Sequence, residues 1–191
     1  MTADSADPRS RPDWATIPNA ITLLRLLLVV PIAVLLVQGA EPVLAFVLLV
    51  IFGASDWVDG TLARLLGQTS RFGALFDPFA DRVGVAVIAS GFVIAGHLAL
   101  WVAVVVVGVD LCLGIVYLLT KPERMPAATR LGKFRTAVFM TGLALIGLGL
   151  LPGAELATAA GGVICAIGAV LHLVVGYGYL RTLLRTRRIR A

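Results

Sequence analysis

Long runs of apolar residues alternate with short polar segments along the chain, and this pattern predicts six helices. A run of about 20 apolar residues is long enough for an α-helix to cross the hydrocarbon core of a bilayer. The runs lie at about 20–38, 43–66, 74–96, 98–120, 136–151 and 156–180. We therefore expect an all-α, polytopic membrane protein with six transmembrane helices.

The composition strengthens this expectation and excludes other classes of protein. Of the 191 residues, 59% are hydrophobic and 14% are charged, against about 45–50% and about 25% in a soluble domain. A disordered chain and a disulfide-rich module are both excluded. Six spans use most of the length, leaving a polar tail at 1–18, a membrane domain at 19–180 and a basic tail at 181–191.

Lysine and arginine are distributed unevenly between the connecting segments, and this predicts the topology. The turns after the first, third and fifth runs contain Glu41, His97 and Glu155 but no lysine or arginine. The basic residues gather in the two tails and in the loops after the second and fourth runs. Because cytoplasmic loops collect basic residues, both termini are expected in the cytoplasm. The net charge of +5 then reflects topology, and no nucleic-acid partner is expected.

Four aspartates lie where the second run ends and the third begins, at the predicted cytoplasmic face. Asp56 and Asp59 share one stripe of their helix, and Asp77 and Asp81 share another at a spacing of i, i+4. The loop between the two helices is short, so we expect them to be antiparallel neighbours. The four carboxylates would then face each other across a small cleft.

Four carboxylates in a region of low dielectric repel one another unless cations neutralise them. Oxygen ligands favour Mg²⁺, Mn²⁺ or Ca²⁺ over zinc. Gly60 and Ala63 leave room for a bulky ligand, and Arg64 supplies a cation suited to phosphate. Purely structural ion pairs with Arg64, Arg71 and Arg82 are disfavoured, because three arginines do not neutralise four acids. The pattern predicts a metal-dependent phosphate site.

The segment from Asp56 to Asp81 resembles the signature of the CDP-alcohol phosphotransferase family, D-x2-D-G-x2-A-R-x8-G-x3-D-x3-D, at all eight fixed positions. Asn19, Thr22 and Arg25 resemble the N-x2-T-x2-R element that opens the first span in the phosphatidyl-transferring branch. The six-span layout is similar over about residues 17–180.

The resemblance implies a phospholipid-synthesising enzyme of the cell membrane, with its active site facing the cytoplasm. Such an enzyme moves a phosphatidyl group from CDP-diacylglycerol to an alcohol and releases CMP, using Mg²⁺ or Mn²⁺, with two ions expected. Asp81 is the implied catalytic base. The implied metal ligands are Asp56, Asp59, Asp77 and Asp81. The implied CDP-donor residues are Asp56, Gly60, Ala63, Arg64 and Gly73.

Two further segments concern the alcohol. Asp77–Arg82 resembles the D-P-x-A-D-[KR] element of phosphatidylglycerophosphate and cardiolipin synthases, and Gly132–Thr136 resembles their G-K-x-K-T element. Glycerol 3-phosphate is the implied acceptor, with phosphatidylglycerol (a cardiolipin synthase) and inositol phosphate as alternatives. The candidate anchors for an anionic acceptor are Arg25, Arg130, Lys133 and Arg135.

The fourth run differs at Asp110 from phosphatidylglycerophosphate and cardiolipin synthases, in which the fourth span often carries an Arg-Asp or Arg-Glu pair. Here Val109 precedes it, so we expect Asp110 to pair with a basic group on another helix or to be protonated. A cation transporter, the alternative from a different class, would place its charges near the midplane rather than at one face.

Two remaining features concern packing and assembly. Glycines recur in the last two runs and predict close helix packing; they are Gly142, Gly147, Gly149, Gly161, Gly162 and Gly168. A homodimer is possible by analogy with the family, and the lipid bilayer is the expected surrounding.

Overall fold

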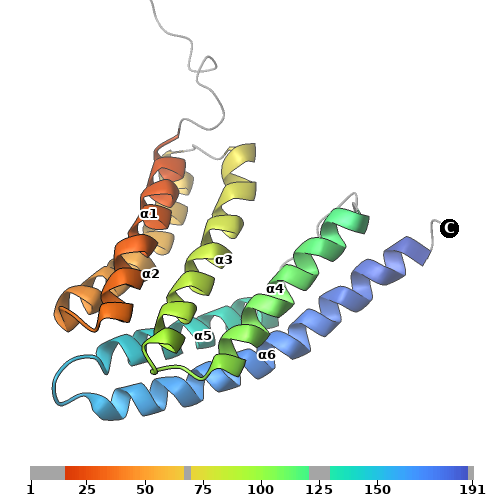
Figure 1. The fold of residues 1–191 in the computed structure, drawn as a ribbon. Helices are drawn as coiled ribbons and strands as arrows, with labels where there is room; N and C mark the ends of the chain where they lie inside the picture. The colour runs from red at the N-terminus through yellow and green to blue at the C-terminus, as the bar shows by residue number, and fades with distance from the viewer. Residues whose placement is uncertain (1–15, 67–69, 121–129, 189–191) are drawn as a thin grey trace, which may run out of the picture.

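The computed structural model describes residues 16–66, 70–120 and 130–188. Within these ranges only the backbone is described at 56–60, 62–64, 66, 71, 130, 133 and 182–188. The described chain forms six helices: α1 (Ile17–Gln38), α2 (Pro42–Leu66), α3 (Arg71–Ile94), α4 (Leu100–Thr120), α5 (Arg130–Leu148) and α6 (Glu155–Arg188) (Figure 1). The predicted all-α class and the six helices are confirmed.

Three of these helices are long and apolar enough to cross a membrane by length and composition. They are α1, α4 and the Glu155–Arg181 part of α6. Helices α2 and α5 contain shorter apolar stretches, at Pro42–Ser55 and Phe134–Leu148. Six membrane crossings with cytoplasmic termini therefore remain a prediction.

The helix boundaries differ most from the sequence prediction at the start of α5 and the end of α6, and by at most about three residues elsewhere. Helix α5 begins at Arg130 rather than near 136, and α6 continues to Arg188 rather than ending near 180. The prediction ended each apolar run at the first group of charges. Arginine, lysine and leucine are all good helix formers, so the backbone stays helical beyond the apolar part.

The helices form two groups, α1 to α3 and α4 to α6, which touch where α3 contacts α4 and where α2 contacts α5 (Figure 1). Helix α1 packs against both α2 and α3, while α6 packs against both α4 and α5. The expected direct packing of α2 on α3 is not among the main helix contacts of the described residues, because α1 packs against each of them instead. Glycines of α3 allow this approach, because a Cβ on Gly73 would meet Asn19 and one on Gly91 would meet Leu36, both on α1.

Apolar side chains cover the outside of the protein as well as its core. Buried residues such as Ile32, Phe92 and Phe139 fill the space between helices. Large side chains on the outer faces are also apolar, including Leu27 at 60% exposure and Leu118 at 68%. A soluble protein rarely exposes so continuous an apolar surface. The outer surface is that of a membrane protein, and lipid would cover it.

Close packing of α5 on α6 depends on glycine, as the sequence predicted. A Cβ on Gly161 would lie 2.6 Å from the Gly142 carbonyl oxygen and 2.7 Å from the Ile146 nitrogen. A Cβ on Gly142 would lie 2.5 Å from Cys165 Sγ. Gly162 is the exception, since no described atom lies within 4 Å of its Cβ position.

Gly161→Ala is therefore expected to lower the free energy of unfolding by about 1–3 kcal/mol, because the clashing atoms belong to the backbone and cannot move aside. Thermal unfolding of the detergent-solubilised protein measures this. Gly162→Ala is the matched control and should unfold at or above the wild-type temperature, since alanine favours helix over glycine. Equal effects of the two substitutions would contradict the packing.

Candidate functional site

The first half of α3 carries Asp77 and Asp81, the two aspartates of the predicted quartet whose side chains are described. Ser70 caps this helix, its hydroxyl accepting a hydrogen bond from the Gly73 amide at 2.8 Å. Asp77 and Asp81 follow, one turn apart on the same face. Both carboxylates contact α1, through Thr22 and Arg25.

Helix α1 contributes a polar stripe that meets these carboxylates. The Thr22 hydroxyl donates a hydrogen bond to Asp77 Oδ1 at 2.8 Å. Arg25 Nη1 lies 3.0 Å from Asp81 Oδ1. Asn19 Nδ2 donates to Ser70 Oγ at 3.2 Å. The three residues of the N-x2-T-x2-R element therefore contact the start of α3.

The Arg25–Asp81 pair joins a buried cation to an accessible carboxylate. The Arg25 side chain is 2% exposed, whereas that of Asp81 is 43% exposed. A buried guanidinium needs an anionic partner to offset the cost of removing it from water. Arg25 was predicted to bind the acceptor, and the structure places it against the predicted catalytic base.

Gly73, predicted as a donor-binding residue, is buried where α1 and α3 meet. A Cβ at this position would lie 2.5 Å from Asn19 Oδ1 and 3.0 Å from Ser70 Oγ. Glycine is therefore needed here for helix contact, whatever else binds nearby.

A polar cavity of about 180 Å³ adjoins Asp81. It lies between α3, α4, α5 and α6. Its lining includes Asp81 and Arg82 of α3, Asp110 of α4, Arg135 of α5 and His172 of α6. The cavity holds roughly six water molecules at ~30 Å³ each, which suits a small polar molecule.

Asp110 links two arginines at this cavity. Its Oδ1 atom lies 3.5 Å from Arg135 Nη2 and 3.8 Å from Arg82 Nε. Of the two expectations for Asp110, pairing with basic groups on other helices is confirmed. One carboxylate shared by two guanidinium groups leaves this part of the cavity positively charged, which favours an anion.

Arg135 has hydrogen-bonding capacity left over. Its side chain is 8% exposed, and its Nε and Nη1 atoms have no hydrogen-bond partner among the described residues. Buried N–H groups are nearly always paired in folded proteins, so these groups are available to water or to a polar ligand in the cavity. A phosphate suits the planar guanidinium best.

His172 also lines the cavity, and its role was not predicted from the sequence. It is 4% exposed and its Nδ1 atom lies 3.1 Å from the Gly168 carbonyl oxygen, one turn earlier in α6. A single histidine in an apolar run carries no signal of its own. Only the packing of α6 against α4 and α5 brings it to the cavity.

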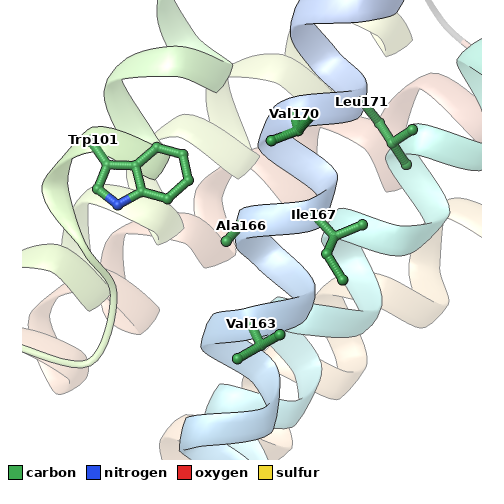
Figure 2. Close-up of a pocket in the computed structure, with 6 residues that line it drawn as sticks. All are labelled: Trp101, Val163, Ala166, Ile167, Val170 and Leu171. Carbon is green, nitrogen blue, oxygen red and sulfur yellow. The ribbon is translucent and has the colours of Figure 1, made fainter.

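A second, larger hollow of about 380 Å³ lies between α4 and α6 (Figure 2). Trp101 of α4 faces Ala166 and Val170 of α6 across it. Its lining is apolar and aromatic throughout, so it offers no group for acid–base or phosphate chemistry. The polar cavity at Asp81 is therefore the candidate site.

For part of the predicted site the structure describes the backbone but not the side chains. These residues are Asp56, Asp59, Gly60, Ala63, Arg64, Arg130 and Lys133. Among the side chains that are described, no group of three or more His, Cys, Asp or Glu residues could hold a metal ion. The described half of the predicted quartet, Asp77 and Asp81, does offer hard oxygen donors on one helix face, as Mg²⁺ requires.

Comparison with known proteins adds an independent observation. The sequence profile of the CDP-alcohol phosphatidyltransferase family matches residues 15–174. A Mycobacterium tuberculosis protein provisionally named a phosphatidylglycerophosphate synthase is 31% identical over 176 residues, covering 90% of this chain and 83% of that protein.

Other relatives carry related names. A second Mycobacterium tuberculosis protein, provisionally named a cardiolipin synthase, is 33% identical over 136 residues, covering 70% of this chain and 65% of that protein. The chain thus spans just under two thirds of that relative. A CDP-diacylglycerol–glycerol-3-phosphate 3-phosphatidyltransferase of Pseudomonas fluorescens is 43% identical over 103 residues, which are 48% of this chain and 49% of the relative.

Proposed function

Because the chain belongs to the CDP-alcohol phosphatidyltransferase family, we propose that it transfers the phosphatidyl group of CDP-diacylglycerol to glycerol 3-phosphate and releases CMP. The observation that carries this proposal is the cavity in which an accessible carboxylate, Asp81, and a buried arginine with unpaired N–H groups, Arg135, line the same space. A base and an anion anchor are the two groups that a phosphorylated alcohol requires.

Asp81 acts as the general base in this proposal. Its carboxylate takes the proton of the attacking hydroxyl while the new oxygen–phosphorus bond forms and the bond to CMP breaks. Arg25 is the positioning residue, because its guanidinium at 3.0 Å holds one carboxylate oxygen in place. A positioned base of this kind contributes about 10²- to 10⁴-fold to a rate.

Arg135 anchors the acceptor. Its Nη2 is held by Asp110 at 3.5 Å, and the Nε and Nη1 hydrogens are available to the phosphate of glycerol 3-phosphate. Anchoring at the phosphate end leaves the distal hydroxyl to reach Asp81. Held in this way, the hydroxyl reacts as if within one molecule.

The metal site of the family fits the residues present. Asp56, Asp59, Asp77 and Asp81 would hold Mg²⁺ or Mn²⁺, with two ions proposed. Bound cations would neutralise the diphosphate and stabilise the CMP leaving group. Arg64, Gly60, Ala63 and Gly73 are proposed to receive the cytidine diphosphate. Thr22 fixes one oxygen of Asp77 by its 2.8 Å hydrogen bond and so orients that ligand.

The proposal includes a membrane arrangement. All six helices would cross the cell membrane, with both termini and the cavity on the cytoplasmic side, where basic residues gather. The acyl chains of the donor would remain in lipid while its head group reaches α2 and α3. A homodimer is compatible with this arrangement and is proposed by family analogy alone.

A cardiolipin synthase is the second candidate, since one relative carries that name. Its acceptor, phosphatidylglycerol, carries a singly charged phosphodiester and two acyl chains. Inositol phosphate is the third candidate acceptor. The two arginines of the cavity favour the doubly charged phosphate of glycerol 3-phosphate over phosphatidylglycerol, and the small cavity favours its compact shape over inositol phosphate.

The test is an assay of the purified protein in vesicles with CDP-diacylglycerol, Mg²⁺ and one acceptor at a time. We expect CMP release and a phosphatidylglycerophosphate product with glycerol 3-phosphate. Cardiolipin formed from phosphatidylglycerol would replace the proposed acceptor by the second candidate. Absence of CMP release with every acceptor would contradict the proposed reaction.

Arg135→Gln is expected to reduce kcat/KM for glycerol 3-phosphate about 100-fold, because removing a buried charged anchor costs about 2–5 kcal/mol. The KM for CDP-diacylglycerol should change little. Arg181→Gln, which removes an exposed cation outside the cavity, is the matched control. Equal losses of affinity for donor and acceptor would indicate a general structural effect instead.

A further inference from the structure

The hydrogen-bonding state of His172 follows from its surroundings. Nδ1 lies 3.1 Å from the Gly168 carbonyl oxygen. A carbonyl oxygen can only accept, so Nδ1 carries the proton and donates. In the neutral ring Nε2 is then an acceptor without a hydrogen. The helix therefore fixes which ring nitrogen is available to a ligand.

The ring is also held in orientation. Its centroid lies 5.9 Å from that of Phe139, with the ring planes at 66°, an edge contact. Because Nδ1 points back at its own helix, the Nε2 side of the ring points away from the α6 backbone. His172 lines the polar cavity together with Phe139, Arg135 and Asp110.

The cavity offers a ligand several donors and few acceptors. Arg82 and Arg135 can only donate. Asp110 already forms ion pairs with both arginines, and Asp81 forms one with Arg25. A ligand hydroxyl that is not the nucleophile must donate its hydrogen somewhere. Two neutral side chains of the described lining can accept it: Nε2 of the buried His172 and the hydroxyl oxygen of the exposed Thr136, which itself donates to the Gly132 carbonyl oxygen. His172 is the one of the two that carries no hydrogen at its accepting atom and is shielded from water.

We propose that His172 is a specificity-determining residue that accepts a hydrogen bond from a second hydroxyl of the acceptor, selecting a polyol phosphate over a simple hydroxyalkyl phosphate. This inference rests on the proposed function. Each of three side chains then contacts one part of the acceptor. Asp81 takes the proton of the attacking hydroxyl, Arg135 binds the phosphate, and His172 binds the middle hydroxyl of glycerol 3-phosphate.

The test compares glycerol 3-phosphate with 3-hydroxypropyl phosphate, which lacks only the middle hydroxyl. The wild type is expected to prefer glycerol 3-phosphate about 10-fold in kcat/KM, the upper range for a neutral hydrogen bond. His172→Asn can keep the bond to the Gly168 carbonyl but loses the acceptor at the Nε2 position. We expect it to turn over the two acceptors equally, with an unchanged KM for CDP-diacylglycerol.

His172→Gln is the rescue variant, because its amide oxygen can reach the position of Nε2. It should regain part of the preference. A preference that survives in His172→Asn, or that is absent from an active wild type, would overturn the role of His172 while leaving the proposed reaction intact. A wild type that releases no CMP with either acceptor would overturn both. Should His172→Asn fail to fold, His172→Gln and the wild-type comparison still decide.

Discussion

Asp81→Asn is expected to lower the rate of phosphatidyl transfer by about 10²- to 10⁴-fold, the usual contribution of a general base. Asparagine has nearly the same shape as aspartate but cannot take the proton of the attacking hydroxyl. CMP release at saturating CDP-diacylglycerol and glycerol 3-phosphate measures the effect. Donor affinity should fall much less than the rate, because Asp56, Asp59 and Asp77 remain.

A structural consequence of this substitution has to be separated from the chemical one. Arg25 is 2% exposed and loses its carboxylate partner, and breaking a buried pair from one side costs about 3–5 kcal/mol. The double variant Arg25→Met, Asp81→Asn removes the unpaired charge and should recover stability without activity. Glu155→Gln, which removes an exposed carboxylate outside the cavity, is the control and should keep the wild-type rate. Normal turnover by a folded Asp81→Asn protein would exclude Asp81 as the base.

Removal of divalent ions is expected to have an effect at least as large. With excess EDTA, CMP release should fall to background, since four carboxylates and a diphosphate would otherwise repel one another. Addition of Mg²⁺ or Mn²⁺ beyond the chelator should restore the rate. The helical content, followed by circular dichroism, should stay constant throughout. Full activity in excess EDTA would remove the metal from the proposal.

The helices could be predicted from the sequence because hydrophobic runs of bilayer length are a strong local signal. Their ends could not, since α5 and α6 extend over basic residues, from Arg130 and to Arg188. A charged residue ends an apolar run, but it does not necessarily end a helix. Arginine is charged and is also a good helix former, so the helix continues past the end of the apolar run.

The site was predictable only as far as its residues share one helix or one motif. The spacing of Asp77 and Asp81 put them on one face, and they do lie on one face of α3. The contact of Arg25 with Asp81 depends on how α1 packs against α3, which glycines such as Gly73 permit. Spacing within one helix carries no information about that packing.

The residues that line the cavity could be predicted even less well from the sequence. Asp110 was expected either to pair across helices or to be protonated, and the structure decides for pairing with Arg82 and Arg135. His172 comes from α6, far along the chain from Asp81, with no motif around it. Only the three-dimensional arrangement shows that both residues line one space.

The central claim is that carboxylates at the α2 and α3 ends bind divalent cations, and Mn²⁺ binding measured by electron paramagnetic resonance tests it most directly. We expect the detergent-solubilised wild type to bind Mn²⁺ in the presence of CDP, and Asp77→Asn to bind it at least 10-fold more weakly. Asp110→Asn should bind it as the wild type does. Superimposable titrations of wild type and Asp77→Asn would contradict the claim.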